Sequence, residues 1–351
     1  MKKIIFDCER MKYHETGIYH YCKNLGHKLI QAIEPLSEQL VLYKPATAKV
    51  VLLKNNTSIR QHSLHKFYMP DTHSYDIWHA TYQNTNYMPV RNKNIKVVLT
   101  IHDLNFIYDE TKTASKKQKY LRHLQHNIDR SDVIVCISDF CKADVLKYCK
   151  PGNKPVHVIY NGTNTLIKPT LSPVSYKPSI RFLFSIGVLT SKKNFHALLP
   201  LLQHNELELL IAGRCDDAGY LDHLLNEARE MGVEKKLHVL GIISETEKSW
   251  YFENCYAFAS PSMAEGFCLP VTEAMSVGKP MFLSSRTALP EIGGKVAFYF
   301  SDFDGNNMQN VFLKGMQQYK ITNMQHAIRE RGSEFCWEKA AAQYLEIYRS
   351  L

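Results

Sequence analysis

The stretch SPSMAEGFCLPVTEAM, residues 260–275, joins the end of a short apolar strand to the start of a helix. The strand ends near Ser260, and Pro270 stands in the first turn of the helix, where the N–H that proline lacks would have no helical partner. The first N–H groups of a helix can bind an anion. In this stretch those groups belong to Phe267, Cys268 and Leu269.

Two carboxylates accompany this predicted anion site, Glu265 in the loop and Glu273 in the helix. Two such charges would repel a bound phosphate unless each faced another group. The hydroxyls of a sugar or a ribose are natural partners, because a carboxylate accepts two hydrogen bonds from a diol. The same spacing of two glutamates also occurs by chance on solvated helices, so the surrounding residues carry much of the argument.

Short apolar runs alternate with amphipathic stretches on both sides of this motif. Strands that are separated by helices pair in parallel, so the pattern predicts doubly wound parallel sheets. In the first half, strands are expected at residues 4–8, 39–43, 50–53, 77–80, 95–101, 133–137 and 156–160. In the second half, strands are expected at residues 181–186, 207–212, 237–240, 257–259 and 280–284, and a helix at 194–203.

A segment rich in Pro, Ser and Thr interrupts the alternation and predicts a linker at residues 166–180. We expect one Rossmann-like domain at residues 1–165 and a second at 181–333. A final helix, at 334–351, is expected to pack back toward the first domain. Two doubly wound domains would face each other across a cleft, and the ligands of such sheets bind at the carboxyl ends of the strands.

The composition, 45% hydrophobic and 22% charged over 351 residues, excludes a disordered or collagen-like chain. No apolar run reaches the roughly 18 residues that span a bilayer. The N-terminus turns acidic at Asp7, too early for a signal peptide. Nine scattered cysteines without a C-x-x-C pair favour reduced thiols in a cytoplasm over a zinc site or a disulfide framework.

The positive charge is concentrated in the first half of the chain. Residues 1–178 hold 26 Lys and Arg against 14 Asp and Glu, whereas residues 179–351 hold 17 against 20. An anionic partner such as a membrane surface, a lipid-diphosphate acceptor or nucleic acid would fit this asymmetry, as would a simple solvated face. Five of the basic residues cluster on or near one predicted helix: Lys112, Lys116, Lys117, Lys119 and Arg122.

The E-x7-E pattern of Glu265 and Glu273 resembles the motif of retaining nucleotide-sugar glycosyltransferases with the GT-B fold, and residues 237–304 resemble family 4 of that group. The resemblance extends over nearly the whole chain and implies an α/β fold of two Rossmann-like domains. A narrower similarity is to bacterial mannosyltransferases of surface-polysaccharide synthesis. The other matching segments are SIG at 185–187, KKNF at 192–195, TIHDL at 100–104, IS at 137–138 and IYNG at 159–162.

The resemblance also implies roles for the residues that would hold a donor. Glu273 would bind the ribose of the donor nucleotide, and Glu265 would contact the donor sugar near its reacting end. Lys193 would offset the charge of the diphosphate, together with the N–H groups near Cys268. A lysine at the start of a helix opposes the helix dipole, which makes a bound anion a plausible partner for Lys193.

Two residues of the first domain complete the predicted site. His102 would lie beside the transferred sugar, where it could donate a hydrogen bond to a hydroxyl or help to handle the acceptor proton. The plainer interpretation is a histidine satisfied by a neighbour such as Asp103. Gly17, without a Cβ, would allow a phosphate to approach closely, although it could also be a turn glycine.

Three residues depart from the family pattern, and each could change the donor preference or weaken the enzyme. Val188 stands where the family often has Arg, Tyr19 where a second glycine is frequent, and Cys268 where glycine is usual. The resemblance implies no catalytic metal and no cofactor apart from the nucleoside-diphosphate sugar itself, and no D-x-D motif stands in a matching loop. The other histidines, such as His62 and His79, show no ligand pattern.

The function predicted is a retaining, metal-independent transfer of a sugar, with GDP-mannose as the first donor, to a glycan or lipid-linked glycan in polysaccharide or lipopolysaccharide synthesis. A UDP-sugar transferase and a nucleotide-sugar epimerase of the same fold are enzyme alternatives. A basic module with an inactive pocket is the non-enzyme alternative, and intact Lys193, Glu265 and Glu273 argue against it. The expected location is the cytoplasm, with peripheral contact to an anionic membrane through the basic domain and no nucleic-acid partner.

Overall fold

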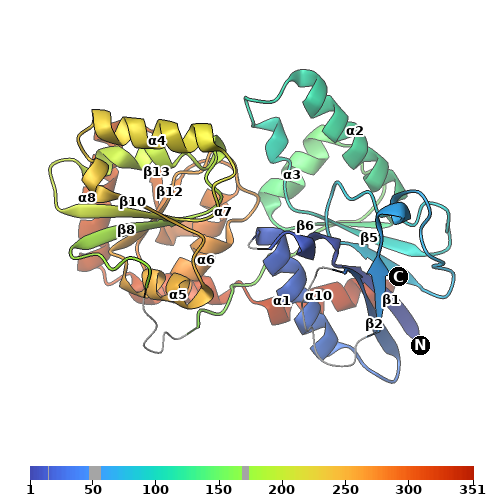
Figure 1. Cartoon of the computed structure of the whole chain (residues 1–351). Coiled ribbons are helices and arrows are strands. Elements are labelled where there is room, and N and C mark those ends of the chain that lie inside the picture. The colour runs from blue at the N-terminus through green and yellow to red at the C-terminus, as the bar shows by residue number, and fades with distance from the viewer. Residues whose placement is uncertain (15, 47–56, 168–173) are drawn as a thin grey trace. The chain divides into compact units, whose positions relative to one another are not determined.

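The computed structural model describes residues 1–14, 16–46, 57–167 and 174–351. The chain forms two compact units, shown in Figure 1, and passes between them twice. Unit 1 consists of Met1–Gly162 and Phe335–Leu351, and unit 2 of Thr163–Glu334. The strand expected at residues 50–53 lies outside the described residues, as do residues 168–173 of the expected linker.

Unit 1 is built on a seven-stranded parallel sheet with the order β3-β2-β1-β4-β5-β6-β7. The register places Ile4 of β1 beside Leu40 on one side and Ile77 on the other. All three side chains are buried, as expected for a sheet that helices cover on both faces. The strands are β1 (Lys2–Asp7), β2 (Glu38–Pro45), β3 (Ser58–Gln61), β4 (Ile77–Ala80), β5 (Lys96–Ile101), β6 (Val133–Cys136) and β7 (Val156–Val158).

Four α-helices and three short 3-10 helices belong to unit 1 among the described residues. Ser138 caps the helix at Asp139–Tyr148, as its position in the sequence predicts. Its hydroxyl accepts the N–H of Cys141 at 3.1 Å. The α-helices are α1 (Gly17–Ala32), α2 (Ala114–Arg130), α3 (Asp139–Tyr148) and α10 (Trp337–Ser350). The 3-10 helices are η1 (Glu9–Lys12), η2 (Ser63–Lys66) and η3 (Asn105–Ile107).

A buried polar network holds the C-terminal helix α10 on the sheet of unit 1. Tyr344 contacts Thr100 of β5 and Tyr21 of α1 through its hydroxyl, both at 2.8 Å. His79 of β4 contacts Tyr348 at 2.5 Å and Thr100 at 2.8 Å. Burial lowers the pKa of His79 to about 3, so its ring is neutral and both nitrogens serve the network.

Unit 2 repeats the architecture with a six-stranded parallel sheet in the order β10-β9-β8-β11-β12-β13. Its core lies between this sheet and the surrounding helices, and every residue of β9 is buried. The strands are β8 (Arg181–Ile186), β9 (Leu207–Ala212), β10 (Leu237–Gly241), β11 (Ala257–Ser260), β12 (Met281–Ser284) and β13 (Phe298–Phe300). The short strands β3 and β13 are the two that the apolar pattern did not reveal.

The segment after β8 differs from the helix expected at residues 194–203. Asn194 has a left-handed backbone with φ of 56° and separates two 3-10 helices, η4 (Ser191–Lys193) and η5 (Phe195–Leu202). Pro200 lies inside η5 and lacks the N–H that a regular α-helix would use. Lys193 therefore ends a short helix and does not begin one, which corrects the helix-dipole argument.

The remaining helices of unit 2 complete the alternation. The α-helices are α4 (Ala218–Glu230), α5 (Glu245–Asn254), α6 (Leu269–Ser276), α7 (Leu289–Gly293), α8 (Gly305–Ile321) and α9 (Gln325–Ser333). The 3-10 helices are η6 (Glu234–Lys236) and η7 (Gly294–Val296). No helix in the described part of the chain combines the length and the apolar character that crossing a membrane needs.

Both sheets confirm the predicted doubly wound fold. In each, the order reverses beside the first strand, between β1 and β4 in unit 1 and between β8 and β11 in unit 2. Ligands of such sheets bind outside the carboxyl ends of the strands at this reversal. The nine cysteines all have free thiols in this structure, and seven of them are buried.

Candidate functional site

The reversal point of unit 2 brings Lys193 and Glu265 together. Lys193 follows β8 and Glu265 follows β11, and the lysine Nζ lies 2.6 Å from Oε1 of the glutamate. Backbone contacts hold the two loops against each other: the N–H of Met263 donates to the carbonyl of Lys192 at 2.9 Å. Gly187 leaves room for the lysine, since a Cβ there would come within 2.8 Å of its Cε.

Both charges of this pair are largely buried, with 15% of the Lys193 side chain and 11% of the Glu265 side chain exposed. Burial alone would raise the pKa of Glu265, but the charges of Lys193 and Lys192 outweigh it and hold the pKa below its ordinary value. Burial likewise opposes the charge of Lys193, and Glu265 reverses that effect and raises its pKa. The pair therefore stays ionised at neutral pH.

Glu273 has its own lysine, which the sequence analysis missed. Lys248 of α5 contacts Oε1 of Glu273 at 2.9 Å, and the amide of Asn164 donates to the same oxygen at 2.8 Å. Lys248 also pairs with Glu245 at 2.8 Å. Lys248 is buried in the structure together with Ser249, Tyr251 and Phe252, but the sequence of α5 has no clear apolar period that would have marked it. Asn164 offered no signal either.

The loop between the two glutamates ends at the expected helix, α6. Cys268 occupies the N-cap position with a left-handed backbone, φ 73°, and the side chains of Phe267 and Leu269 are buried beside it. Burial raises the pKa of the Cys268 thiol to about 12, so this thiol is neutral. The start of α6 places the N–H groups of Phe267, Cys268 and Leu269 at the N-terminal end of the helix. Their contact with a phosphate stays a prediction.

The predicted residues of unit 1 lie at the carboxyl ends of their strands. His102 follows β5 and is buried, with Nε2 donating to the carbonyl of Thr81 at 2.8 Å. Burial lowers its pKa, so the ring is neutral. This partner differs from Asp103, the neighbour that the plainer interpretation named. Gly17 is the first residue of α1, and a Cβ there would meet nothing within 4 Å, so packing alone does not require glycine.

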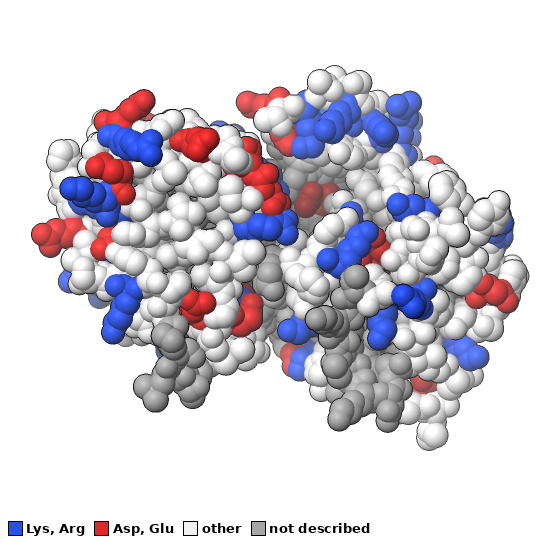
Figure 2. All heavy atoms as spheres, in the orientation of Figure 1, with Lys and Arg blue, Asp and Glu red and all other residues white. Residues whose placement is uncertain are grey.

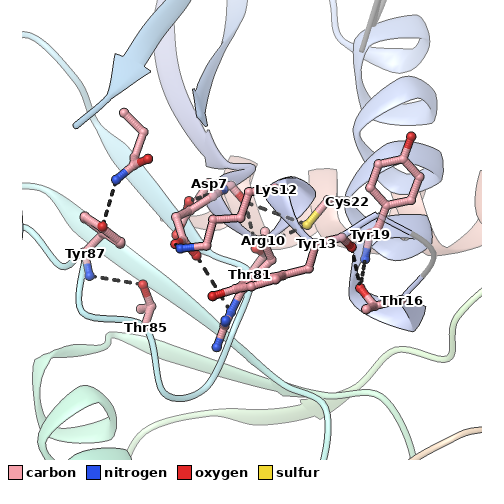
Figure 3. A network of polar contacts seen from close by, with 12 residues as sticks. Asp7, Arg10, Lys12, Tyr13, Thr16, Tyr19, Cys22, Thr81, Thr85 and Tyr87 are labelled. Atoms are coloured by element: carbon pink, nitrogen blue, oxygen red, sulfur yellow. Dashed lines mark hydrogen bonds and ion pairs between the residues drawn. The ribbon is translucent and has the colours of Figure 1, made fainter. Parts of the chain in front are cut away.

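A polar network at the reversal point of unit 1, shown in Figure 3, was not expected from the sequence. Asp7 ends β1, and its carboxyl accepts the N–H of Glu9 at 2.8 Å. Thr81, after β4, donates to the carbonyl of Asp7 at 2.6 Å. The guanidinium of Arg10 lies 3.7 Å from the centre of the Tyr82 ring. Burial raises the pKa of Asp7 to about 8, so this carboxyl is largely protonated at neutral pH.

The five basic residues named around α2 divide into two groups. Lys112 is paired with Asp109, and Lys117 donates to the carbonyl of Ile107 at 2.7 Å. Figure 2 shows Lys and Arg side chains gathered over α2. The exposed members of the group are Lys116, Lys119 and Arg122.

Solved structures of the GT-B type share this fold. The chain aligns over its whole length with sucrose-phosphate synthase from Thermosynechococcus elongatus, with a TM-score of 0.80, 17% identity and 99% coverage of that chain. It aligns equally fully with HepE of Anabaena in complex with UDP and glucose, with a TM-score of 0.77 and 17% identity over 100% of both chains. At these identities the likeness establishes the fold.

Family models establish the class of enzyme. The model described as Glycosyltransferase Family 4 matches residues 58–165, and the model described as Glycosyl transferases group 1 matches residues 175–296. Together they cover more than half of the chain. The chain belongs to the family 4 glycosyltransferases, as its motifs suggested.

The similar curated proteins include several mannosyltransferases. O-antigen chain mannosyltransferase B of Escherichia coli is 24% identical over 392 aligned positions, which cover 99% of this chain and 100% of that protein. O-antigen chain mannosyltransferase RfbU of Salmonella typhimurium is 23% identical over 233 aligned positions, which cover 65% of this chain and 62% of that protein.

The backbone of Cys268 yields a first prediction. A left-handed residue with a Cβ is strained and glycine is not, so Cys268→Gly should be more stable than Cys268→Ala by about 1 kcal/mol. Denaturant unfolding of the two variants measures the difference. Gln317, exposed within α8, is the control, because there the alanine variant should be more stable than the glycine variant. An alanine variant of Cys268 that equals the glycine variant contradicts the strain.

The carboxyl of Asp7 yields a second prediction. The pKa of Asp7 is about 8 in the folded chain, against an ordinary 3.8. Between these two pH values the folded chain keeps a proton on Asp7 that the unfolded chain has released. The stability that this proton contributes is complete below about pH 4 and is lost as the pH rises toward 8. The loss is up to about 1.4 kcal/mol per pH unit.

Asp7→Asn should remove this dependence, because the amide cannot titrate. We expect its unfolding free energy to fall less than that of the unmodified chain between pH 5 and pH 8, measured in urea at several pH values. Asp71→Asn is the control, since Asp71 is exposed and its pKa lies below its ordinary value, outside this window. Parallel pH curves for the unmodified chain and Asp7→Asn would rule out a protonated Asp7.

Proposed function

We propose that this glycosyltransferase moves a sugar from a nucleoside-diphosphate sugar, with GDP-mannose as the first candidate, to a glycan or lipid-linked glycan acceptor. The transfer retains the anomeric configuration and uses no metal. The observation that carries the proposal is the pairing of each motif glutamate with a lysine, Lys193 with Glu265 and Lys248 with Glu273. Two carboxylates that are already neutralised do not repel a diphosphate.

Each residue of the donor site then has a distinct task. Lys193 shares its positive charge between Glu265 and the diphosphate, and the N–H groups at the start of α6, near Cys268, face the same anion. Glu273 accepts hydrogen bonds from the ribose, and Glu265 from the sugar. In unit 1, Nε2–H of neutral His102 is already engaged by the carbonyl of Thr81, so Nδ1 is the atom that can accept a hydrogen bond from a sugar hydroxyl. Gly17, without a Cβ, leaves space for a phosphate of the donor beside the first turn of α1.

The transfer step balances without any further reactant. The bond between the anomeric carbon and the diphosphate oxygen breaks, and the acceptor oxygen forms its bond to the same face of that carbon. The acceptor proton passes to the departing diphosphate. Positioning and stabilisation of the negative charge on the leaving group lower the barrier.

The choice of donor rests on the relatives. O-antigen chain mannosyltransferases of Escherichia coli and Salmonella typhimurium support a mannosyl donor and a role in polysaccharide or lipopolysaccharide synthesis. HepE of Anabaena, which was solved with UDP and glucose, supports the second candidate, a UDP-sugar donor.

Donor binding and turnover test the proposal together. Among GDP-, UDP-, ADP- and dTDP-sugars, we expect GDP-mannose to give the largest rise in melting temperature, and the anomeric signal of the product in NMR to match that of the donor. Glu273→Gln should weaken nucleotide binding at least tenfold. Lys193→Met should lower kcat about 100-fold or more, because it removes the cation that faces the leaving group.

Glu253→Gln is the matched control for Glu273→Gln, since Glu253 is exposed on α5 and should leave donor binding unchanged. If no nucleotide sugar raises the melting temperature, donor binding is refuted. If Glu273→Gln binds nucleotide as tightly as the unmodified chain, its ribose role is refuted. If the product has the opposite anomeric configuration, retention is refuted.

We also propose that the exposed basic residues of α2 bring the enzyme to the inner face of an anionic membrane in the cytoplasm. Replacing Lys116, Lys119 and Arg122 by Gln should weaken binding to vesicles with anionic lipid tenfold or more, because each charge near such a surface contributes about 1 kcal/mol. Three exposed lysines of unit 2, Lys235, Lys295 and Lys314, are the control set. Vesicle binding that ignores both salt and the triple variant excludes this contact.

A further inference from the structure

A cluster of three metal-ligating side chains lies in unit 2, apart from the glutamates and lysines described above. His223 and Glu227 stand one turn apart on α4, and Nε2 of the histidine lies 3.4 Å from Oε1 of the glutamate. His196 of η5 completes the cluster, with its ring centre 4.8 Å from that of His223. The three ligand atoms all lie within 4.8 Å of one another.

The spacing within this cluster suits a small tetrahedral ion. Residues at i and i+4 lie on the same side of a helix, so His223 and Glu227 present their ligand atoms together. Two ligands of one Zn²⁺, each bound at about 2.0–2.2 Å, are separated by about 3.4 Å in a tetrahedron. That is the distance between Nε2 of His223 and Oε1 of Glu227.

The third ligand is positioned by a neighbouring hydroxyl. Tyr220 contacts Nδ1 of His196 at 3.2 Å and accepts the backbone N–H of the same residue at 3.3 Å. With Nδ1 engaged, Nε2 is the nitrogen that turns toward a metal. Histidine ligands in metal sites characteristically have their second nitrogen held in this way.

We propose that His196, His223 and Glu227 bind one divalent transition-metal ion, best matched by Zn²⁺, with water in the fourth position. Two imidazoles and one carboxylate select such an ion over Mg²⁺ or Ca²⁺, which prefer oxygen ligands alone. None of the three ligands belongs to the proposed donor site.

The ion would join two ligands, His196 and His223, that are 27 positions apart in the sequence. It would link α4 to η5, and His196 stands only three positions after Lys193. Binding would therefore restrain the segment after β8 and raise the stability of unit 2. The role that follows is structural: the metal fixes the start of η5, and the lysine that precedes it is held more tightly.

Zinc titration of the full chain tests this site. A Cys215→Ser background removes the exposed thiol that could bind zinc by itself. We expect one Zn²⁺ per chain by calorimetry, a rise in melting temperature, and a visible absorption band typical of tetrahedral coordination when Co²⁺ is used. His196→Ala, His223→Ala and Glu227→Gln should each weaken Zn²⁺ binding at least tenfold.

His326→Ala is the matched control, since His326 is an exposed histidine of α9 and should leave zinc affinity unchanged. Hydrogen exchange at residues 191–202 should slow when Zn²⁺ is added to the background chain and not when it is added to His223→Ala. The proposal is wrong if the background chain binds no Zn²⁺ at 100 μM, or if His223→Ala and Glu227→Gln bind it as tightly as the background chain. These readouts do not involve nucleotide sugars, so they stand whether or not the donor proposal holds.

Discussion

The ion pair between Lys193 and Glu265 is the interaction on which the candidate site of unit 2 depends. Two opposite charges that are mostly withdrawn from water are stable only as partners, and removing one leaves the other buried alone at a cost of about 3–5 kcal/mol. The pair forms because β8 and β11 are neighbours at the reversal of the sheet. The strand order therefore determines that these two loops, 72 positions apart in the sequence, carry complementary charges to one place.

The pair of Lys248 and Glu273 lies beside the segment through which the chain enters unit 2. Glu273 receives Lys248 from α5 and Asn164 from the segment that has just entered unit 2 after Gly162. Both donors contact the same carboxylate oxygen. The position of this carboxylate thus depends on α5, α6 and the segment that begins unit 2. A ligand that binds Glu273 must share its carboxylate with Lys248 of α5 and with Asn164 of that segment.

The sequence predicted the alternation of strands and helices, which repeats along the chain. It did not predict contacts between residues that are distant in the sequence. Alternating apolar and amphipathic runs predicted both doubly wound sheets, and the helix start at Pro270 was correct. Lys248 was missed because its partner lies 25 positions away on another helix. The left-handed backbone of Asn194, which separates η4 from η5, is a conformation that no periodic pattern reports.

Asp7 shows the same limit in unit 1. The sequence shows Asp7 only as the end of an apolar run, and its raised pKa comes from burial at the end of β1, beside Thr81 and Glu9. Burial depends on neighbours that are distant in the sequence. The roles implied for Gly17, His102 and the N–H groups of α6 stay predictions, because they concern a bound ligand. The structure fixes only their positions.

The side chains at the two reversal points have different charge states, so the two points suit different kinds of ligand. In unit 2, both motif glutamates are paired with lysines, and the ammonium of Lys193 is available to a second anion. In unit 1, burial keeps both Asp7 and His102 neutral at physiological pH. A neutral carboxyl and a neutral imidazole recognise hydroxyl groups without attracting or repelling charge. The paired charges of unit 2 therefore suit an anionic ligand, whereas the neutral carboxyl and imidazole at the ends of β1 and β5 suit hydroxyl groups.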